Sequence, residues 1–371
     1  MRVKGLKNIV LSSDQITTHG HEQQKGFLQR LEFVEVKSCG DICTLFPAKL
    51  RQGFKNLKSV EIERCKLLKE VFELGEFDEE SNEEKELLLL LPSLKTLKLS
   101  QLPELICIWK GPTRNVSLRS LTRLNLQDLD KLTFIFPPYL PQSLPQLQTL
   151  EVENCRELKH IIREKDGDER KMIAESFGFP QLKTVDISRC CKLEYVFPVS
   201  VSKTLQSLPQ LETLKIRDCR ELEHIIREED GGREIISESP GFPELKTIFI
   251  EKCGKLEYIF PVSVSQTLQN LERMTISYVY NLKQIFYSRE GDALTGDGII
   301  KLPQLRDLSL LRPKSNCSFF GPKNFAAQLP SLQNLTIHGH EELGNLLAQL
   351  QVRPLYFSTN YFPLKSEDKC K

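Results

Sequence analysis

One phrase of the sequence recurs along most of the chain at intervals near thirty residues. It reads L-x-x-L-x-x-[LIV]-x-[LIV]-x-x-C-x-x-L-x-x-[IV]-[FI], where x is any residue, as in "LPQLETLKIRDCRELEHII" (208–226). A fixed period of this kind indicates a repeat architecture, because each unit buries its apolar face only by stacking on its neighbours. The first residue of the central apolar pair marks eleven copies: Val34, Val60, Leu97, Leu124, Leu150, Val185, Leu214, Ile248, Met274, Leu308 and Leu335.

The phrase resembles the leucine-rich-repeat signature L-x-x-L-x-L-x-x-[NC]-x-L, with one extra residue between the cysteine and the next leucine. Within each copy, apolar residues such as Leu214 and Ile216 alternate with polar ones, which is the period of a strand with one buried face. The downstream pair, such as 225–226, is expected to return the chain along the opposite side. We therefore expect an α/β solenoid, a leucine-rich-repeat horseshoe with a concave parallel β-sheet and a convex side of irregular chain and short helices.

The repeats are expected to span residues 28–350. A degenerate half-repeat or flank is expected in 1–27, and a flexible tail in 351–371. Two kinds of connection join the copies. Proline-led segments such as "FPVSVSQTLQNL" (260–271) have helical spacing of apolar residues, since proline suits a first helical turn. Polar excursions such as "ELGEFDEESNEEKE" (73–86) are expected to be solvated loops.

Composition narrows the class of protein. The 51 basic residues nearly balance 50 acidic ones, so overall charge provides no argument for binding nucleic acid or an anionic membrane. The densest apolar run, "ELLLLLPSL" (86–94), is too short to span a bilayer, and "MRVKGLKNIVLSSDQ" lacks the apolar core of a signal peptide. An odd number of cysteines, eleven, favours free thiols in a reducing compartment. We expect a cytoplasmic protein without a membrane span.

Cysteine and histidine stand five residues apart in two copies, Cys155 with His160 and Cys219 with His224. Such a pair is compatible with a thiol nucleophile and its base, or with half of a metal site. The repeat favours packing instead, because other copies fill the cysteine position with leucine or valine. A buried thiol there packs as a small apolar group that weakly hydrogen-bonds the turn backbone. The histidine position is expected to face outward, away from the thiol.

No other chemistry is apparent. The sequence has no phosphate-binding G-x-x-x-x-G-K-[ST], no G-x-G-x-x-G, no G-x-S-x-G and no H-E-x-x-H. Trp109 occupies a position that holds phenylalanine in other copies, and we therefore assign it to the core. We expect no enzyme activity, no cofactor and no metal.

The strand residues that alternate with the buried ones define a candidate partner-binding surface on the concave face. Their charges are mixed in sign, which suits a protein partner better than a phosphate backbone. Phe249 is singled out because exposed aromatic residues can anchor interfaces, and Tyr278 lies one repeat further on. The candidate residues are Glu61, Glu63, Lys98, Asn125, Glu151, Glu153, Asp186, Lys215, Arg217, Phe249, Glu251, Thr275 and Tyr278. Ser188 and Ser277 follow the same alternation.

Copies reading "FPxLKTVxIxxCxKLEYVFP" and "LPxLxTLxIxxCxxLxxII", with acidic excursions between them, resemble the repeat region of plant intracellular nucleotide-binding leucine-rich-repeat disease-resistance proteins of the coiled-coil class. This resemblance implies pathogen perception, with repeats that restrain a nucleotide switch and respond to an effector or a guarded host protein. The nucleotide-binding and signalling domains of that family have no counterpart here, so none of their residues is carried over.

The expected chain is therefore a recognition module, as a fragment or truncated form of such a receptor. Its expected partner is an effector, a guarded host protein or the nucleotide-binding domain of a full-length receptor. The alternative is a leucine-rich-repeat substrate adaptor of a ubiquitin ligase or another scaffold protein. A secreted receptor ectodomain is disfavoured because the cysteine position and the Phe-Pro pair replace the Asn and Gly-x-Ile-Pro pattern of such repeats.

Overall fold

The computed structural model describes most of each repeat and groups the chain into two compact units, residues 1–182 and 183–371. In both units a long strand alternates along the chain with a short one. The described residues are 8–11, 30–47, 54–74, 91–111, 118–137, 144–163, 179–197, 208–227, 241–288, 298–311, 320, 325–338 and 350–351.

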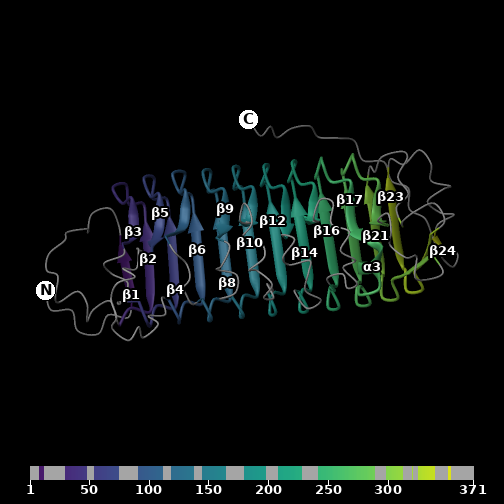
Figure 1. The fold of residues 1–371 in the computed structure, drawn as a ribbon, viewed down its shortest axis with the longest axis horizontal. Helices are drawn as coiled ribbons and strands as arrows, with labels where there is room; N and C mark the ends of the chain where they lie inside the picture. The colour runs from purple at the N-terminus through teal and green to yellow at the C-terminus, as the bar shows by residue number, and fades with distance from the viewer. Residues whose placement is uncertain are drawn as a thin grey trace, which may run out of the picture. The chain divides into compact units, whose positions relative to one another are not determined.

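The long strands of the first unit form one parallel sheet in chain order (Figure 1). They are β1 (Asn8–Leu11), β2 (Phe33–Lys37), β4 (Ser59–Glu63), β6 (Thr96–Ser100), β8 (Arg123–Gln127) and β10 (Thr149–Glu153). The short strands form parallel sets β3–β5–β7 and β9–β11. They are β3 (Thr44–Phe46), β5 (Glu70–Glu73), β7 (Cys107–Lys110), β9 (Phe134–Phe136) and β11 (His160–Ile162).

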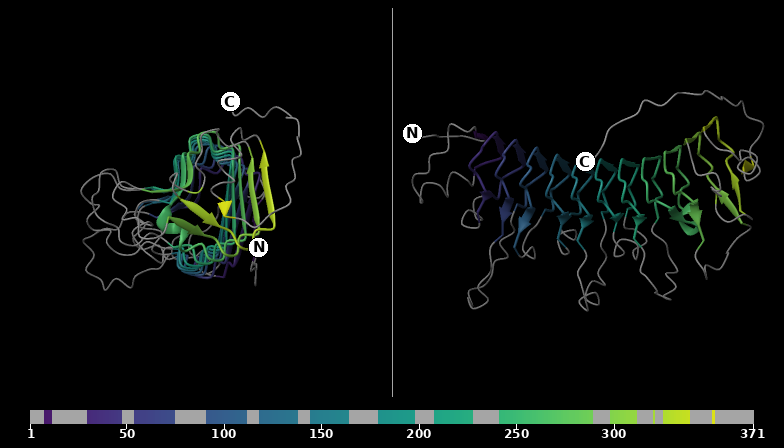
Figure 2. Two further views of the ribbon diagram at one scale, coloured as in Figure 1. Left: turned by 90° about the vertical axis from the view of Figure 1, so that its right-hand side faces the viewer. Right: turned by 90° about the horizontal axis from the view of Figure 1, so that it is seen from above.

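The second unit repeats this arrangement. Its long strands are β12 (Thr184–Ser188), β14 (Thr213–Arg217), β16 (Thr247–Glu251), β18 (Arg273–Ser277), β21 (Asp307–Leu311) and β23 (Asn334–His338), parallel and in chain order. Its short strands are β13 (Tyr195–Phe197), β15 (His224–Ile226), β17 (Tyr258–Pro261), β19 (Gln284–Tyr287), β20 (Ile299–Lys301), β22 (Ala326–Gln328) and β24 (Leu350–Gln351). The end-on view in Figure 2 shows the short strands opposite the long ones.

The core lies between the two layers of strands. In β14, Leu214 and Ile216 are fully buried, while the residues that alternate with them are half-buried. All eleven marker residues of the repeat are buried in the same way. About six buried apolar side chains per repeat, each contributing roughly 1.5–3 kcal/mol, stabilise the stack. The predicted leucine-rich-repeat solenoid with a parallel sheet is confirmed.

The long strands from β2 to β18 end in the same backbone turn. The residue after the strand adopts the left-handed conformation, as at Ser38 (φ 55°) and Asp218 (φ 53°), which is uncommon for a residue with a side chain. The Ser38 N–H donates to the carbonyl of Glu63 at 2.9 Å, and the Asp218 N–H to that of Glu251 at 2.9 Å. The turn therefore continues the hydrogen-bond ladder of the sheet into the next repeat.

The repeated cysteine lies directly after this turn. All six cysteines at this position are buried, and each Sγ donates to the carbonyl two residues earlier at 3.5–3.6 Å. They are Cys39, Cys65, Cys155, Cys190, Cys219 and Cys253. Burial raises the pKa of the Cys39, Cys65 and Cys253 thiols, which keeps them neutral. The prediction that this position packs against the turn is confirmed.

The predicted outward orientation of the histidine position holds for only part of the chain. His224 is exposed, as expected, whereas Cys219 is buried. Tyr195, at the same position one repeat earlier, is only 3% exposed, so the prediction is wrong there. The Arg227 guanidinium lies 5.2 Å from the centre of the Tyr195 ring and covers it. The ring of Tyr195 is therefore buried instead of pointing into solvent, whereas Tyr258 at the same position is half-buried.

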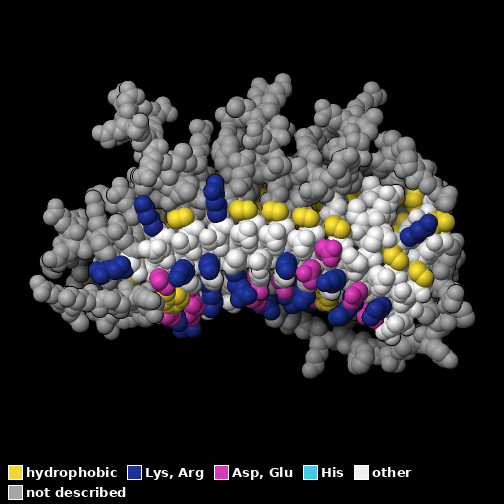
Figure 3. All heavy atoms as spheres, turned by 90° about the horizontal axis from the view of Figure 1, so that it is seen from below, with side chains coloured by type: hydrophobic (Ala, Val, Ile, Leu, Met, Phe, Trp, Pro, Cys, Tyr) yellow, Lys and Arg dark blue, Asp and Glu magenta, His cyan; other side chains and the backbone are white. Residues whose placement is uncertain are grey.

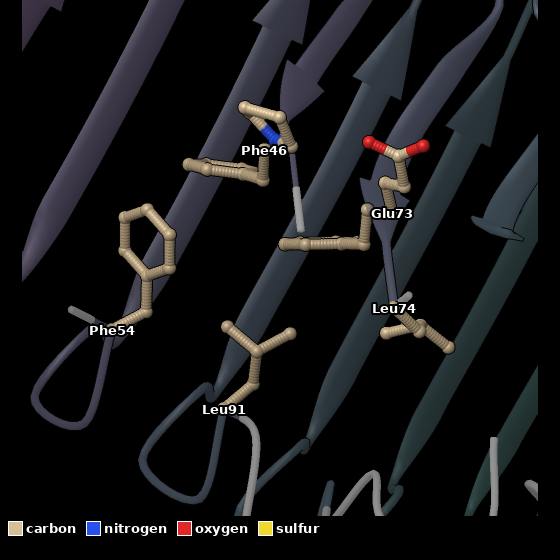
Figure 4. A pocket seen from close by; sticks show the side chains of 7 residues that line it. Phe46, Phe54, Glu73, Leu74 and Leu91 are labelled. Atoms are coloured by element: carbon tan, nitrogen blue, oxygen red, sulfur yellow. The ribbon is translucent and has the colours of Figure 1, made fainter. Parts of the chain in front are cut away.

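Aromatic side chains stack along the short strands of the first unit. The Phe46 and Phe72 rings lie 4.9 Å apart and nearly parallel, and Trp109 stacks on Phe72 at 5.0 Å. Trp109 is 3% exposed, so its predicted place in the core is confirmed. Beside this stack is a cavity of about 20 Å³, bounded in part by Phe54 and Leu91 (Figure 4). That volume holds about one water molecule and no larger ligand.

Of the predicted connections, the described residues include one short helix, α3 (Val262–Ser265), which begins after Pro261 within the expected segment 260–271. Pro261 lies outside the first turn and has an extended conformation, with φ −63° and ψ 151°. The acidic excursion beyond Leu74, the tail from residue 352 and most of the corresponding segment at 197–208 lie outside the described residues.

Candidate interaction surface

The candidate residues lie on the face of each sheet that points away from the short strands. Except for Tyr278, all of them occupy the half-buried positions that alternate with core residues in the long strands. The parallel register places equivalent positions of neighbouring strands side by side, so these side chains form rows across the repeats. In the strand register, Lys215 lies beside Phe249, and Phe249 lies beside Thr275.

In the first unit the rows are internally paired. Lys98 Nζ on β6 lies 2.7 Å from Glu61 Oε1 on β4, and Asn125 Nδ2 on β8 donates to Glu151 Oε2 on β10 at 2.7 Å. Lys37 lies between the carboxylates of Glu35 and Glu63. The hydrogen bond to Glu35 is the main reason that the pKa of Lys37 is raised. A partner that binds this face must compete with these existing pairs.

In the second unit the rows are paired only in part. Arg217 Nη2 on β14 lies 2.8 Å from Asp186 Oδ1 on β12. Further along, Lys215, Glu251 and Thr275 make no side-chain hydrogen bond or ion pair to any residue that the structure describes. These three surround Phe249, which is half-buried on the same face. We name Lys215, Phe249, Glu251 and Thr275 the unpaired face.

One candidate residue, Tyr278, and two serines that follow the same alternation, Ser188 and Ser277, do not lie on the accessible sheet face. Ser188 and Ser277 are only 9% and 3% exposed, so these small residues at the ends of β12 and β18 are not available to a partner. Tyr278 is not on the sheet face. It takes the left-handed turn after β18 (φ 55°), and its ring meets that of Tyr280 edge-on at a centroid distance of 6.4 Å.

Sequence reasoning did not single out two exposed apolar side chains, Leu67 and Ile106, which are 48% and 52% exposed. Both lie in turns of the first unit between a long strand and the following short one. The repeat places no constraint on these positions, so the only available indication was an apolar residue where other copies have a polar one. Single exposed apolar residues are common on protein surfaces.

Neither a metal site nor a membrane span is found in the described ranges. No group of three or more His, Cys, Asp or Glu side chains there is arranged to hold a metal ion. The part of the chain that is described also contains no helix of the length and apolar character needed to cross a bilayer.

Comparison with solved structures returns other leucine-rich-repeat proteins. The repeat domain of the type III effector XopL is 17% identical over 81% of this chain and 71% of its own, with a TM-score of 0.41. A leucine-rich cell surface protein of Faecalibacterium prausnitzii is 13% identical, covering 94% of this chain and 92% of its own at a TM-score of 0.29. The plant peptide hormone receptor RGFR1, solved with RGF2, is 13% identical, covering 88% of this chain and 70% of its own at a TM-score of 0.24.

No curated protein has a significant match to the chain. A family model does match, in three overlapping or adjoining parts, residues 4–156, 157–220 and 209–280. That model describes the leucine-rich repeats of plant disease resistance protein RPS2-like sequences. The matched parts span well over half of the chain and coincide with the repeats that carry the buried cysteine. The chain therefore belongs to the RPS2-like leucine-rich-repeat family of plant disease resistance proteins.

Proposed function

We propose that this chain is a recognition module of plant innate immunity that acts inside the cell. Its repeats belong to a family of protein-interaction modules, and the sheet face supplies the surface. The partner is a pathogen effector or a guarded host protein, and in a full-length receptor also the nucleotide-binding domain. The observation that carries the proposal is the unpaired face of the second unit.

The unpaired face has the features of a binding surface. Phe249 on β16 provides an aromatic anchor. Lys215 on the neighbouring strand β14 and Glu251 further along β16 have no side-chain partner in the described structure. A few central aromatic residues usually contribute most of the binding free energy of an interface. Because Lys215 and Glu251 carry opposite charges and are not already paired, a partner can engage both without breaking an internal ion pair.

The rigid backbone beneath the unpaired face also supports its proposed role as a binding surface. Each strand of the unpaired face is held between two parallel neighbours, and Leu214, Ile216, Ile248 and Ile250 beneath it are buried. Side chains on a fixed backbone lose less conformational freedom when a partner binds, which favours affinity.

Proximity labelling of the tagged chain in plant tissue, with and without pathogen effectors, tests the proposal. We expect an effector or a guarded host protein to be labelled, and the double variant Phe249→Ala/Lys215→Ala to lose that labelling. The matched control, Lys98→Ala/Glu61→Ala, removes a paired set from the first unit and should retain it. Recovery of ubiquitin-ligase components alone would point to a substrate adaptor and reject the immune function.

A further inference from the structure

Three tight turns bring cations to one edge of the first unit, where its long strands begin. In these turns the N–H groups of Leu57, Leu94 and Leu121 donate to the carbonyls three residues earlier at 3.0–3.3 Å. The second residue of each turn is exposed or half-buried. In chain order these residues are Lys55, Pro92 and Arg119, so two of the three are cations.

A second row of cations runs beside the first and is fixed by the backbone. The Lys58 N–H donates to the carbonyl of Glu32, and the Lys95 N–H donates to that of Lys58, both at 2.7 Å. The Thr122 N–H in turn donates to the carbonyl of Lys95 at 2.9 Å, so Thr122 takes the position of Lys95 in the next repeat. Arg123, the first residue of β8, follows Thr122 and lies beside Thr96 of β6. These bonds place the cations of consecutive repeats on adjacent strands, about 5 Å apart.

The turns are also bound to each other. The Ser120 hydroxyl donates to the carbonyl of Pro92 at 2.7 Å, and the Thr122 hydroxyl to that of Lys95 at 3.0 Å. The backbone that carries Arg119 and Arg123 is therefore held against the preceding repeat. The cations form a pre-arranged group, which we name the basic edge: Lys55, Lys58, Lys95, Arg119 and Arg123.

The basic edge is nearly free of compensating charge. Lys58 pairs with Glu32 at 3.0 Å, and the turns 54–58, 91–95 and 118–123 contain no acidic residue. The other four cations are exposed and have no side-chain hydrogen bond or ion pair within the described structure. Figure 3 looks onto this edge and shows dark-blue Lys and Arg side chains along both units, with magenta Asp and Glu side chains among them.

The corresponding edge of the second unit is balanced. There Lys246 Nζ lies 3.0 Å from Glu212 Oε2, and Arg273 Nε lies 3.9 Å from Asp307 Oδ2. A net charge of only +1 for the whole chain shows that the excess on the basic edge is local. A local excess of charge of one sign, without internal partners, is typical of a surface that binds a partner of opposite charge.

We propose that the basic edge binds an acidic polypeptide segment of a partner protein. Three adjacent strands span about 10 Å, and an extended segment presents side chains on one face about every 7 Å, so two or three carboxylates match the row. The guanidinium groups of Arg119 and Arg123 can each bind a carboxylate through two parallel hydrogen bonds. This surface involves none of the unpaired face, so the two proposals stand or fall separately.

A nucleic acid fits this edge less well. The affinity of a nucleic-acid surface grows with the number of phosphates it neutralises, and strongly salt-dependent binders make about six to ten such contacts, more than these five cations supply. A longer phosphate backbone would also approach the carboxylates of Glu61, Glu63 and Glu151 on the adjoining sheet face. A membrane would need an apolar contribution, and the turns of this edge expose only Pro92 among apolar side chains.

Fluorescence anisotropy with a labelled hexaglutamate peptide tests the proposal on the whole chain. The variant Lys55→Glu/Lys95→Glu/Arg119→Glu/Arg123→Glu should lose affinity on the order of tenfold or more at low salt. The matched control, Lys66→Glu/Lys69→Glu/Arg220→Glu/Lys301→Glu, makes the same change in net charge at exposed cations elsewhere. It should change affinity less than about twofold if position matters more than total charge.

Equal losses in the two variants would overturn the proposal, because binding would then follow net charge alone. Tighter binding of phosphatidylserine vesicles or of a single-stranded oligonucleotide than of hexaglutamate, lost in the same variant, would replace it with a membrane or nucleic-acid surface. Circular dichroism checks that both variants fold. Should the glutamate variant unfold, the corresponding quadruple glutamine variant removes the same charges and should show the same ordering of affinities.

Discussion

In the first unit Lys98 and Glu61 of the sheet face are paired and four cations of the basic edge are unpaired within the described structure, whereas in the second unit Lys215 and Glu251 of the sheet face are unpaired and the turn edge carries ion pairs. Lys98 meets Glu61 on the first face, but Lys215 and Glu251 on the second have no side-chain partner in the described structure. The same fold thus supports two distributions of free charge. Since the backbones are equivalent, the residues at solvent-facing positions alone produce the difference.

The two units share their buried scaffold and differ in their surface charges. Both units bury the same alternating residues and end their long strands in the same left-handed turn. Changes to these shared elements should affect both units alike, whereas changes to surface charges should affect only the unit that carries them.

The largest expected effect concerns the scaffold. Leu97→Asp in the first unit and Leu214→Asp in the second each bury a carboxylate in place of a fully buried leucine. Each should reduce the free energy of unfolding by more than about 4 kcal/mol. Hydrogen exchange should show lost protection in the flanking repeats as well, because each repeat is stabilised by its neighbours. Loss confined to the mutated repeat would contradict a shared scaffold.

A smaller effect is expected at the repeated cysteine. Cys65→Ala and Cys219→Ala each remove a buried thiol and its hydrogen bond to the turn carbonyl. Each should cost about 1–2 kcal/mol of unfolding free energy in urea titrations. A clear difference between the two would mean that the units do not share this packing. Changing the exposed Cys43 to alanine is the control and should cost little.

The same thiols predict a pH dependence. Burial raises the pKa of Cys253 well above its ordinary value, so the folded state disfavours the thiolate. Its contribution to stability is complete below the ordinary thiol pKa and is lost as pH rises from there towards the raised value. Urea titrations across this alkaline range should show the decline, and Cys253→Ala should flatten it. In native protein at neutral pH, iodoacetamide should label the exposed Cys43 before Cys253.

The left-handed turn offers a gain in stability. Lys252 takes φ 53° after β16, whereas Asn154 already occupies the equivalent turn in the first unit. Asparagine tolerates this conformation better than lysine, so Lys252→Asn should raise the unfolding free energy by about 0.5–1 kcal/mol. Asp128→Asn in the first unit starts from a residue that also tolerates the turn, and should change thermal unfolding little.

The smallest effect concerns the charge pairs on the sheet face of the first unit. Lys98→Ala removes the exposed pair with Glu61, and such surface pairs contribute about 0–1 kcal/mol. The melting temperature should therefore change little at physiological salt. A large loss would show that the charge pairs of the first unit hold its fold together and are not only a surface property.

Much of the architecture followed from the repeat alone. The alternation around Leu214 predicted the strand, its buried side and its solvent side, and the position of Cys219 predicted a buried turn residue. Tyr195 was misassigned because its position lies between inward-facing residues and was expected to face outward, whereas its ring is covered by Arg227. The left-handed turns were not predicted, since residues as different as Arg64, Asn154 and Tyr278 adopt them.

The sequence by itself determined the period, the strands and which residues face the core, because burial follows from a local alternation of apolar and polar residues. Only the tertiary structure decided which charges are free. Lys98 meets Glu61 across 37 residues of chain, and Lys95 follows Lys58 through a backbone hydrogen bond at 2.7 Å. Such neighbours depend on the register between stacked strands, which brings together residues that no local pattern connects.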